Sequence, residues 1–512
     1  MVQQQTKFPV VLIHGVFGYG RERPAWSCFP PYWPESHLQQ LNPNHIIVDV
    51  GVASSDHDRA CEMFYQLRGG TVDYGEEHAK HTTHARYGAV YETARHPNWS
   101  ELNPIHLVGH SLGALTALEF YQLVSADFFG VGSNYKWVRS ITSIAGPLTG
   151  STLTHMVGLH DTTMTKGSLA HLLYIALAMW AKLHVRVPFL RRAYDFRMDQ
   201  WNEHSFSQLV AVDGPINQSM DSGFYSILPS RRVQLNAQLK HMDKLHLMSI
   251  VTSPKTCHVP VKEASTFAVI LLFVWGKFPR WWPSMAKTKP FRSIAVLLFC
   301  WSLWKQVEQL DVAKLPSLYG LKWLMRRTAK ALPKIFDGYE AHQWQHNDGA
   351  VNIHSQLRPW FPKPHELSTT TATERMDPHT KTVVGTLASS RSKALHAVDS
   401  VPLEARSRCD SHISISDFHH DADETGVKEA AAEEETRRQA TQRFIKGRWY
   451  VYRVDSNHFA GTYWDCEARN LYKSLFVQMV NEYENESDSE DCDVKDAATS
   501  EPHGRSLPVA IA

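Results

Sequence analysis

The serine at position 111 stands in a sequence pattern that suits nucleophilic chemistry. Residues 109–113 read GHSLG; the apolar run Pro104–Val108 precedes them and the helix-forming run Leu112–Val124 follows. Small residues beside such a serine allow a sharp, strained turn from strand to helix that exposes the hydroxyl group. The amino end of the helix also directs backbone N–H groups, here that of Leu112, at a developing oxyanion. The pattern predicts Ser111 as a nucleophile for acyl transfer.

A second motif, His14-Gly15, ends the first apolar run of the chain. A turn of this kind brings a backbone N–H, here that of Val16, to face the nucleophile. Together with the Leu112 amide it would form an oxyanion hole, which stabilises a tetrahedral transition state. Histidine followed by glycine is also found in ordinary turns, but the two motifs in this order favour the oxyanion hole.

A serine nucleophile needs a base, and the base needs a carboxylate that orients it. In α/β-hydrolases the chain order is Ser, then Asp or Glu, then His. Asp348 lies in an Asn-Asp-Gly turn that suits a strand end, and His458 follows the last strand-like run, Arg448–Val454. The chain has 29 histidines, so composition does not select the base, and spacing alone leaves both assignments open.

The elements that must position these residues are short apolar runs separated by helical stretches. Five runs read as buried parallel strands: Phe8–Ile13, Ile46–Val50, Pro104–Val108, Val138–Ile144 and Leu245–Val251. Helices that alternate with such strands cross over a parallel sheet. We therefore expect an α/β protein of the α/β-hydrolase fold, with a mostly parallel central sheet flanked by helices, a lid or extra subdomain, and a disordered insertion.

Two apolar segments do not fit the pattern of alternating strands and helices. Ser168–Leu183 is apolar on most faces and fits either a buried helix or a lid over an acyl pocket. Residues 263–305 hold two apolar runs with tryptophans and a basic stretch between them. Each run is shorter than the roughly 20 residues that span a bilayer, and aromatic residues beside cations suit a membrane interface. We favour an interfacial anchor there, with a buried helical hairpin and true membrane spans as alternatives.

Length and composition exclude several other classes of protein. The chain has 512 residues, enough for a large enzyme core, and its net charge of +1 provides no field that would attract nucleic acid. Its seven cysteines form no CxxC pair, which argues against a disulfide framework or a thiolate zinc site. The first apolar run is too short for a signal peptide. We expect a cytoplasmic or peripheral membrane protein, and secretion stays open.

The last third of the chain changes in composition. Residues 361–445 are rich in serine, threonine, alanine and charge without a sustained apolar period, which favours a disordered insertion. A short charged helix is predicted inside it at Val427–Arg443. The predicted hydrolase domain covers 1–360 and contains an extra subdomain at 54–90, a lid at 160–200 and the apolar insertion at 263–305. The disordered insertion at 361–445 follows it. The end of the hydrolase fold lies at 446–483, and an acidic disordered tail at 484–512.

Seven stretches of the chain share the pattern of one enzyme family: 10–22, 54–88, 105–117, 140–153, 194–201, 346–352 and 455–461. In them the sequence resembles the zinc-containing thermoalkalophilic lipases of the bacillary and staphylococcal group and their plant and algal relatives. They frame most of residues 8–355 and a piece around 448–480. The block at 54–88, SSDHDRACEMFYQLRGGTVDYGEEHAKHTTHARYG, is the most specific, because generic hydrolases lack it.

The resemblance implies roles for three residues. Ser111 would be the nucleophile, His458 the general base and Asp348 its orienting acid. The separation between the last two exceeds the family spacing, and the insertion at 361–445 accounts for the excess. Such an insertion is tolerable, because the entropic cost of loop closure grows slowly with loop length.

The resemblance also implies a structural zinc site, held by two aspartates and two histidines, that braces the extra subdomain. Three ligands match: Asp58, His78 and His84. Two imidazoles and a carboxylate suit zinc. The fourth ligand falls near Ser226 or Ser230, neither of which is a good ligand, so water or Asp221 after a register shift would complete the site. A hydrogen-bonded polar cluster without a metal is the alternative.

A calcium site near the triad histidine is a further property of the bacterial relatives. Asp465 matches one of its ligands, but Ala460 stands where a glutamate is expected. Calcium is therefore doubtful in this chain.

The sequence as a whole predicts a lipase or carboxylesterase that hydrolyses lipid esters, with long-chain acylglycerols as the expected substrates, through an acyl-enzyme intermediate. Its partners would be the lipid ester and a membrane or lipid-droplet surface that it binds peripherally. One alternative is a phospholipase or acyltransferase with the same triad. Another is a catalytically silent hydrolase-fold protein that binds membranes through 263–305, against which the intact triad argues.

Overall fold

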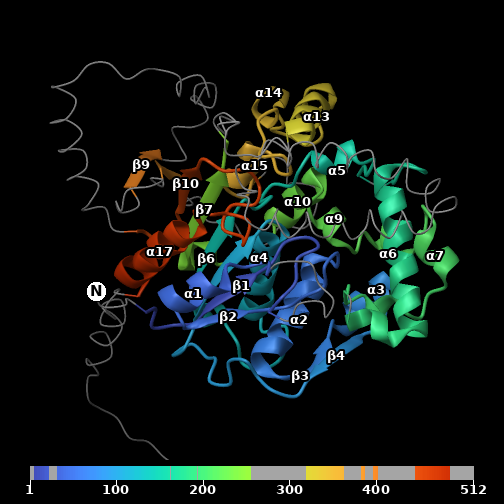
Figure 1. Cartoon of the computed structure of the whole chain (residues 1–512), viewed down its shortest axis with the longest axis horizontal. Helices are drawn as coiled ribbons and strands as arrows, with labels where there is room; N and C mark the ends of the chain where they lie inside the picture. The colour runs from blue at the N-terminus through green and yellow to red at the C-terminus, as the bar shows by residue number, and fades with distance from the viewer. Residues whose placement is uncertain are drawn as a thin grey trace, which may run out of the picture.

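The computed structural model describes residues 5–21, 31–161, 163–192, 194–254, 319–361, 382–386, 396–401 and 444–484. A central sheet lies between helices on its two faces, and further helices extend from one side of this core (Figure 1). This architecture confirms the predicted fold class, a mostly parallel sheet flanked by helices.

Eight strands form the main sheet in the order β2-β1-β5-β6-β7-β10-β8-β9. They are β1 (Val10–Ile13), β2 (His45–Ile47), β5 (Ile105–His110), β6 (Val138–Ile144), β7 (His246–Thr252), β8 (Thr382–Thr386), β9 (His396–Val401) and β10 (Trp449–Val454). Neighbouring strands are parallel except β8 and β9, which are antiparallel. A separate antiparallel hairpin consists of β3 (Gly70–Asp73) and β4 (Tyr87–Tyr91).

The described α-helices surround this sheet and extend beyond it. They are α1 (Glu35–Leu41), α2 (Asp56–Arg68), α3 (Glu76–Thr82), α4 (Leu112–Ser125), α5 (Leu153–Met156), α6 (Leu169–Arg186), α7 (Phe206–Val210), α8 (Pro215–Ser219), α9 (Gly223–Ser226), α10 (Pro229–Asn236), α13 (Tyr319–Ala331), α14 (Ala341–Trp344), α15 (Ile353–Leu357) and α17 (Ala468–Gln478). After α17 the chain continues into one π-helical turn, Met479–Tyr483.

The sheet is buried on both faces, as its continuous apolar runs predict. Val11 and Ile13 of β1 pack into a core with α2 and α4, whereas Val10 and Leu12 pack into a second core with α1 and α17. Successive residues of a strand point to opposite faces, so a strand covered by helices on both faces needs apolar residues at every position. The sheet is therefore a rigid base for the loops at its ends.

Helix α6 has one buried and one exposed side, which fits the lid alternative better than a helix buried on all sides. Tyr174, Leu177 and Ala178 are buried. Four exposed apolar side chains, Leu169, Leu172, Met179 and Leu183, recur with helical spacing along one side, and Val185 is exposed in the last turn. Ser168 caps the helix by accepting a hydrogen bond from the His171 amide.

Two strands lie inside residues 361–445, where the sequence predicts a disordered insertion. β8 pairs with β10 from Thr382 to Thr386, and β9 extends the sheet beyond it. The β-branched residues of TVVGT favour a strand. Without β8, the backbone groups along one edge of β10 would have no partner strand, and β8 supplies one. Disorder is therefore wrong for these two segments. The other residues of that range lie outside the described residues, as do the predicted helix at Val427–Arg443 and the apolar insertion at 263–305. Among the described helices, none is long and apolar enough to cross a membrane.

Glu484, the first residue of the predicted disordered tail, is part of the folded core. Its carboxylate accepts hydrogen bonds from the backbone amides of Lys7 and Phe8 at 2.9 and 3.0 Å, and lies 3.2 Å from His106 Nε2. The prediction of a disordered tail is wrong at Glu484, because these donors hold its carboxylate against the segment that leads into β1. Residues 485–512 lie outside the described residues.

We expect the substitution Glu484→Gln to lower the free energy of unfolding by about 1–3 kcal/mol at pH 7, because an amide cannot accept from both backbone donors. Burial raises the pKa of Glu484, but the hydrogen bonds from His106 and the two amides hold it below its usual value. A depressed carboxyl pKa contributes stability above the unfolded pKa of about 4.3, and this contribution is lost as the pH falls through the folded pKa. Urea unfolding at pH 7 and pH 3 measures it, with Glu482→Gln as the control. An equal loss at both pH values would contradict the prediction.

Candidate active site and metal cluster

Ser111 occupies a strained turn between β5 and α4. Its backbone angles are φ 55° and ψ −126°, in a region that non-glycine residues rarely adopt. A Cβ atom on Gly109 would lie 2.3 Å from the Gly113 carbonyl oxygen, and one on Gly113 would lie 2.1 Å from the carbonyl oxygen of Ile13. The two glycines are therefore required for the turn to pack against the neighbouring strand.

Of the three residues assigned from the resemblance, His458 lies within hydrogen-bonding distance of both Ser111 and Asp348. His458 Nε2 is 2.9 Å from Ser111 Oγ, and His458 Nδ1 is 2.9 Å from Asp348 Oδ2. Ser111 follows β5 and His458 follows β10, while Asp348 contacts Thr252 at the end of β7. The carboxyl ends of parallel strands meet at one edge of a sheet. This arrangement brings Asp348 and His458 together although 110 positions separate them in the chain.

The Asp348 carboxylate is fully enclosed by hydrogen-bond donors. Oδ2 accepts from Thr252 Oγ1 at 2.6 Å and from Gln356 Nε2 at 2.9 Å, and Oδ1 accepts from the Val351 amide at 2.8 Å. Burial alone raises the pKa of Asp348, but the charge and hydrogen bond of His458 and these donors hold it below its usual value. The arrangement keeps the carboxylate ionised beside the imidazole.

The peptide that carries the Val16 amide is held in a fixed orientation. The Gly15 carbonyl accepts hydrogen bonds from His14 Nδ1 at 2.9 Å and from the Gly18 amide at 3.1 Å. The N–H of the next residue belongs to the same peptide plane and points the opposite way. Within the described parts of the chain, the amides of Val16 and Leu112 donate no backbone hydrogen bond. Both can therefore donate to a ligand.

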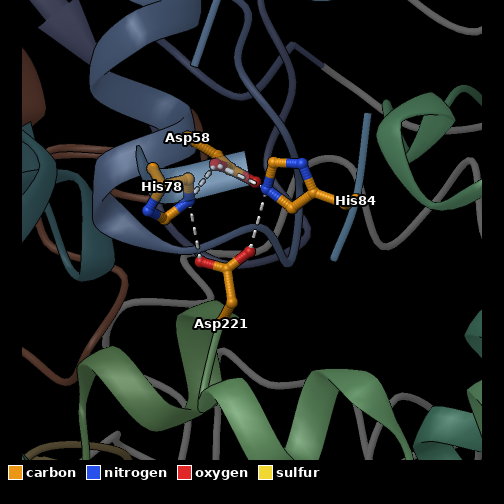
Figure 2. Close-up of side chains that lie close together, drawn as sticks. All are labelled: Asp58, His78, His84 and Asp221. Atoms are coloured by element: carbon orange, nitrogen blue, oxygen red, sulfur yellow. Dashed lines mark hydrogen bonds and ion pairs between the residues drawn. The ribbon is translucent and has the colours of Figure 1, made fainter. Parts of the chain in front are cut away.

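Two aspartates and two histidines face one another beside the hairpin β3–β4 (Figure 2). Asp58 lies on α2, His78 on α3, His84 in the loop that follows α3, and Asp221 just before α9. One ligand atom from each residue lies within 4.8 Å of the others. His78 Nε2 is 3.1 Å from Asp58 Oδ1 and 3.5 Å from Asp221 Oδ1, and His84 Nε2 is 3.4 Å from Asp221 Oδ2. The set could hold one metal ion.

The electrostatics of this cluster favour a positive charge at its centre. Although burial alone lowers it, the carboxylates of Asp221 and Asp58 raise the pKa of His84 to about 10. Burial alone raises the pKa of Asp58, but hydrogen bonds and charge from the two histidines hold it well below its usual value. His84 Nε2 and Asp221 Oδ2 are buried and make no hydrogen bond within the described residues. A metal cation would satisfy both atoms, so the residues fit a metal ion.

Further contacts orient these side chains from outside the cluster. Gln200 Nε2 donates to Asp58 Oδ2 at 2.8 Å. His84 Nδ1 lies 2.8 Å from the carbonyl oxygen of Ala85 and donates to it, which turns Nε2 toward the cluster. Metal-binding histidines commonly make such a second hydrogen bond.

The expected position of the fourth ligand, near Ser226 or Ser230, is wrong. Ser226 Oγ donates to Asp56 Oδ1 at 2.8 Å, and Ser230 Oγ donates to Asp161 Oδ1 at 2.6 Å. Asp221, the alternative by a register shift, lies in the cluster instead. Asp221 lies two residues before α9, whereas Ser226 is the last residue of that helix.

The Asp465 carboxylate, which matches a calcium ligand, is used inside its own loop. It accepts from the Gly461 amide at 2.8 Å and from the Glu467 amide at 3.0 Å. Within the described ranges, the group of Asp58, His78, His84 and Asp221 is the one set of residues whose geometry suits a metal ion.

Sequence reasoning missed several residues that support the site. Thr252 and Gln356 bind Asp348, Gln200 binds Asp58, and Tyr32 lies beside the nucleophile turn. Gln200 stands in the family-like stretch 194–201, which could have drawn attention to it. Thr252 and Tyr32 carry no local signal, because their roles depend on contacts between distant segments. Gln356 lies eight positions after Asp348 and stands in no motif.

Comparisons with known proteins agree with this fold. Residues 6–127 match the family model described as Lipase-like, C-terminal domain. The chain is 33% identical to Lipase 2 of Staphylococcus aureus over 173 residues, which are 29% of this chain and 25% of that protein. It is 28% identical to a lipase of Staphylococcus hyicus over 264 residues, which are 45% of this chain and 38% of that protein.

Solved structures show the same fold. EstA from Clostridium botulinum superposes with a TM-score of 0.52 at 20% identity, covering 94% of this chain and 88% of that one. The crystal structure of Staphylococcus hyicus lipase gives a TM-score of 0.52 at 17% identity, covering 98% of this chain and 99% of that one. In sequence, the chain spans 25% and 38% of the length of the two curated relatives. In sequence the chain is similar to staphylococcal lipases over part of its length, and in fold it is similar to bacterial lipases and esterases.

Proposed function

We propose that the protein is a serine ester hydrolase that acts on lipid esters through Ser111, His458 and Asp348. The observation that carries the proposal is the pair of 2.9 Å contacts that link Ser111 to His458 and His458 to Asp348. This geometry is that of an activated nucleophile, in which an oriented base touches the hydroxyl.

The reaction follows from these contacts. His458 Nε2 takes the proton of Ser111 Oγ as the oxygen attacks the ester carbonyl. The amides of Val16 and Leu112 donate to the oxyanion. The tetrahedral intermediate collapses, the C–O bond to the alcohol breaks, and His458 gives its proton to the leaving oxygen. Water then attacks the acyl-enzyme in the same way and releases the acid.

Acylglycerols are the proposed substrates. The support comes from the relatives, which are named lipases, and from the exposed apolar side of α6, on which Leu169, Leu172, Met179 and Leu183 lie. An apolar helix side of this kind gains free energy when it meets a lipid surface. On this proposal α6 is a lid, and the protein binds a membrane or lipid-droplet surface peripherally. A cytoplasmic or peripheral membrane location remains part of the proposal.

The test is hydrolysis of short- and long-chain p-nitrophenyl esters and of emulsified triolein, with the wild type and Ser111→Ala. Activity that favours emulsified long chains and disappears in the variant supports the lipase. Release of fatty acid from phospholipid vesicles, or acyl transfer to an added alcohol, would favour the phospholipase or acyltransferase alternative. A folded wild type that is inactive on every ester would leave the silent, membrane-binding alternative.

We further infer that the cluster of Asp58, His78, His84 and Asp221 binds a structural Zn²⁺. Two imidazoles and two carboxylates are a ligand set that zinc accepts in tetrahedral geometry. A bound ion would tie α2 and α3 to the segment before α9. It would stabilise the fold and take no part in the ester chemistry.

We expect one zinc ion per purified chain, and its loss in Asp221→Asn. Bound metal stabilises the folded state by mass action, by about 3 kcal/mol at a free concentration of 100 times the dissociation constant. Elemental analysis and thermal unfolding with and without a chelator measure both effects. Asp213→Asn, an exposed change in the same segment, is the matched control. Zinc retained in full by Asp221→Asn would contradict the assignment.

A further inference from the structure

A chain of hydrogen bonds joins the oxyanion loop to the backbone of the base. The Gly15 amide donates to Tyr32 Oη at 2.9 Å, Tyr32 Oη lies 2.5 Å from His110 Nδ1, and His110 Nε2 lies 2.8 Å from the His458 carbonyl oxygen. His110 precedes the nucleophile in the GHSLG motif. These contacts lie outside the triad and the oxyanion amides.

The chemistry of the end groups allows only one arrangement of protons along this chain. A carbonyl oxygen accepts and cannot donate, so His110 Nε2 carries the proton in the contact with His458. His110 Nδ1 then accepts from the Tyr32 hydroxyl, whose oxygen accepts the Gly15 N–H. Burial lowers the pKa of His110 to about 3, so the ring stays neutral under assay conditions.

Neighbouring residues hold this chain of hydrogen bonds in place. The His110 ring is 2% exposed and meets the rings of Tyr32 and Trp33 edge-on, at centroid distances of 5.7 and 6.4 Å. The Tyr32 carbonyl also accepts from the Tyr463 amide at 2.9 Å, on the loop that carries His458. Tyr32 therefore holds the loop of the base by its backbone and, through His110, by its side chain.

We propose that His110 and Tyr32 are positioning residues that fix the distance between the base and the oxyanion loop. The inference rests on the proposed function, because it assigns the two residues to the same acyl transfer. The His458 ring reaches Ser111 and Asp348 only from a defined backbone position. A displacement of about 1 Å in such a site can reduce the rate about 100-fold. Loss of the hydrogen bond from His110 Nε2 to the His458 carbonyl should therefore lower kcat with little effect on KM.

Two amide substitutions at His110 separate the two hydrogen bonds. Glutamine places an N–H where His110 Nε2 stands, and keeps the donor to His458. Asparagine places an oxygen near the Nδ1 position, and keeps only the acceptor for Tyr32. We expect kcat for p-nitrophenyl butyrate to fall about 10- to 100-fold in His110→Asn, and His110→Gln to stay within about 3-fold of the wild type, with KM changed less than about 2-fold in both.

Tyr32→Phe tests the other hydrogen bonds of the series, from the Gly15 amide to Tyr32 and from Tyr32 to His110. Unlike His110→Gln, it also leaves the Gly15 amide without its acceptor, so it should lower kcat about 5- to 10-fold. Its effect should not multiply fully with that of His110→Asn, because both interrupt the same series of hydrogen bonds. The matched controls are Tyr121→Phe, which removes a buried hydroxyl that donates to the His241 carbonyl, and His106→Asn at the other end of β5. Both controls should lower the melting temperature and leave kcat unchanged.

A structural role alone would predict a different pattern. In that case His110→Asn and His110→Gln would lose stability and activity together, with no rescue by glutamine, and the proposal would be overturned. It would also fail if His110→Asn kept the wild-type kcat. If Ser111→Ala kept its activity, the proposed function itself would be wrong, so the two failures are distinguishable.

Discussion

Replacing Ser111 by alanine is expected to lower the kcat of ester hydrolysis by about 10⁶-fold, the size of the loss when a serine protease loses its nucleophile. On the proposed mechanism the Oγ atom forms the covalent bond to the acyl group, and its proton goes to His458 Nε2 at 2.9 Å. What remains is the contribution of the oxyanion amides and of substrate binding. Initial rates on p-nitrophenyl butyrate, together with labelling by a fluorophosphonate, measure the loss.

Two features of the structure make this substitution easy to interpret. Alanine keeps the Cβ atom, so the strained backbone at φ 55° carries the same strain in the variant. The melting temperature should stay close to that of the wild type. Ser125→Ala, at the other end of α4, is the matched control and should keep full activity. More than about 1% residual activity in a pure preparation of Ser111→Ala would contradict the assignment of the nucleophile.

The parts of the fold that the sequence predicted are those set by local pattern. The apolar runs at 8–13, 104–108 and 138–144 became β1, β5 and β6, because a strand covered on both faces needs apolar residues throughout. The strained turn at Ser111 was predictable because only small neighbours fit it. The turn's glycines contact backbone atoms, as the close approach of Gly113 to Ile13 shows.

The parts that could not be predicted depend on contacts between distant segments. The candidate metal cluster is complete only with Asp221. This residue lies more than 130 positions after the two histidines, and only the fold brings it to them. The hydrogen bond from Thr252 to Asp348 joins residues 96 positions apart, and the one from Thr252 to Gln356 joins residues 104 positions apart. Glu484 reads as the start of an acidic tail, and only the folded chain shows that it binds the amides of Lys7 and Phe8. No local pattern marks such partners.

The substitution Asp348→Asn is expected to reduce kcat by about 10⁴-fold, the size of the effect when the acid of a serine triad becomes an amide. The structure indicates why. Oδ1 accepts from the backbone amides of Val351 and Ala350 at 2.8 and 2.9 Å, so the amide oxygen of the variant must take that position. The amide NH₂ group then faces His458 Nδ1 and donates to it. The imidazole would carry its proton on Nε2, and it could no longer accept the proton of Ser111.

A second substitution separates the charge and orientation of Asp348 from simple packing. Thr252→Val removes one donor to the same carboxylate oxygen but leaves the charge and the His458 contact, so its kcat should fall less than about 10-fold. Both variants should fold, which circular dichroism and the melting temperature check. If the two variants lost activity equally, the carboxylate would act only as part of the packing around His458. A much larger loss in Asp348→Asn requires that the carboxylate sets the tautomer of the base, because the two substitutions disturb the same buried oxygen.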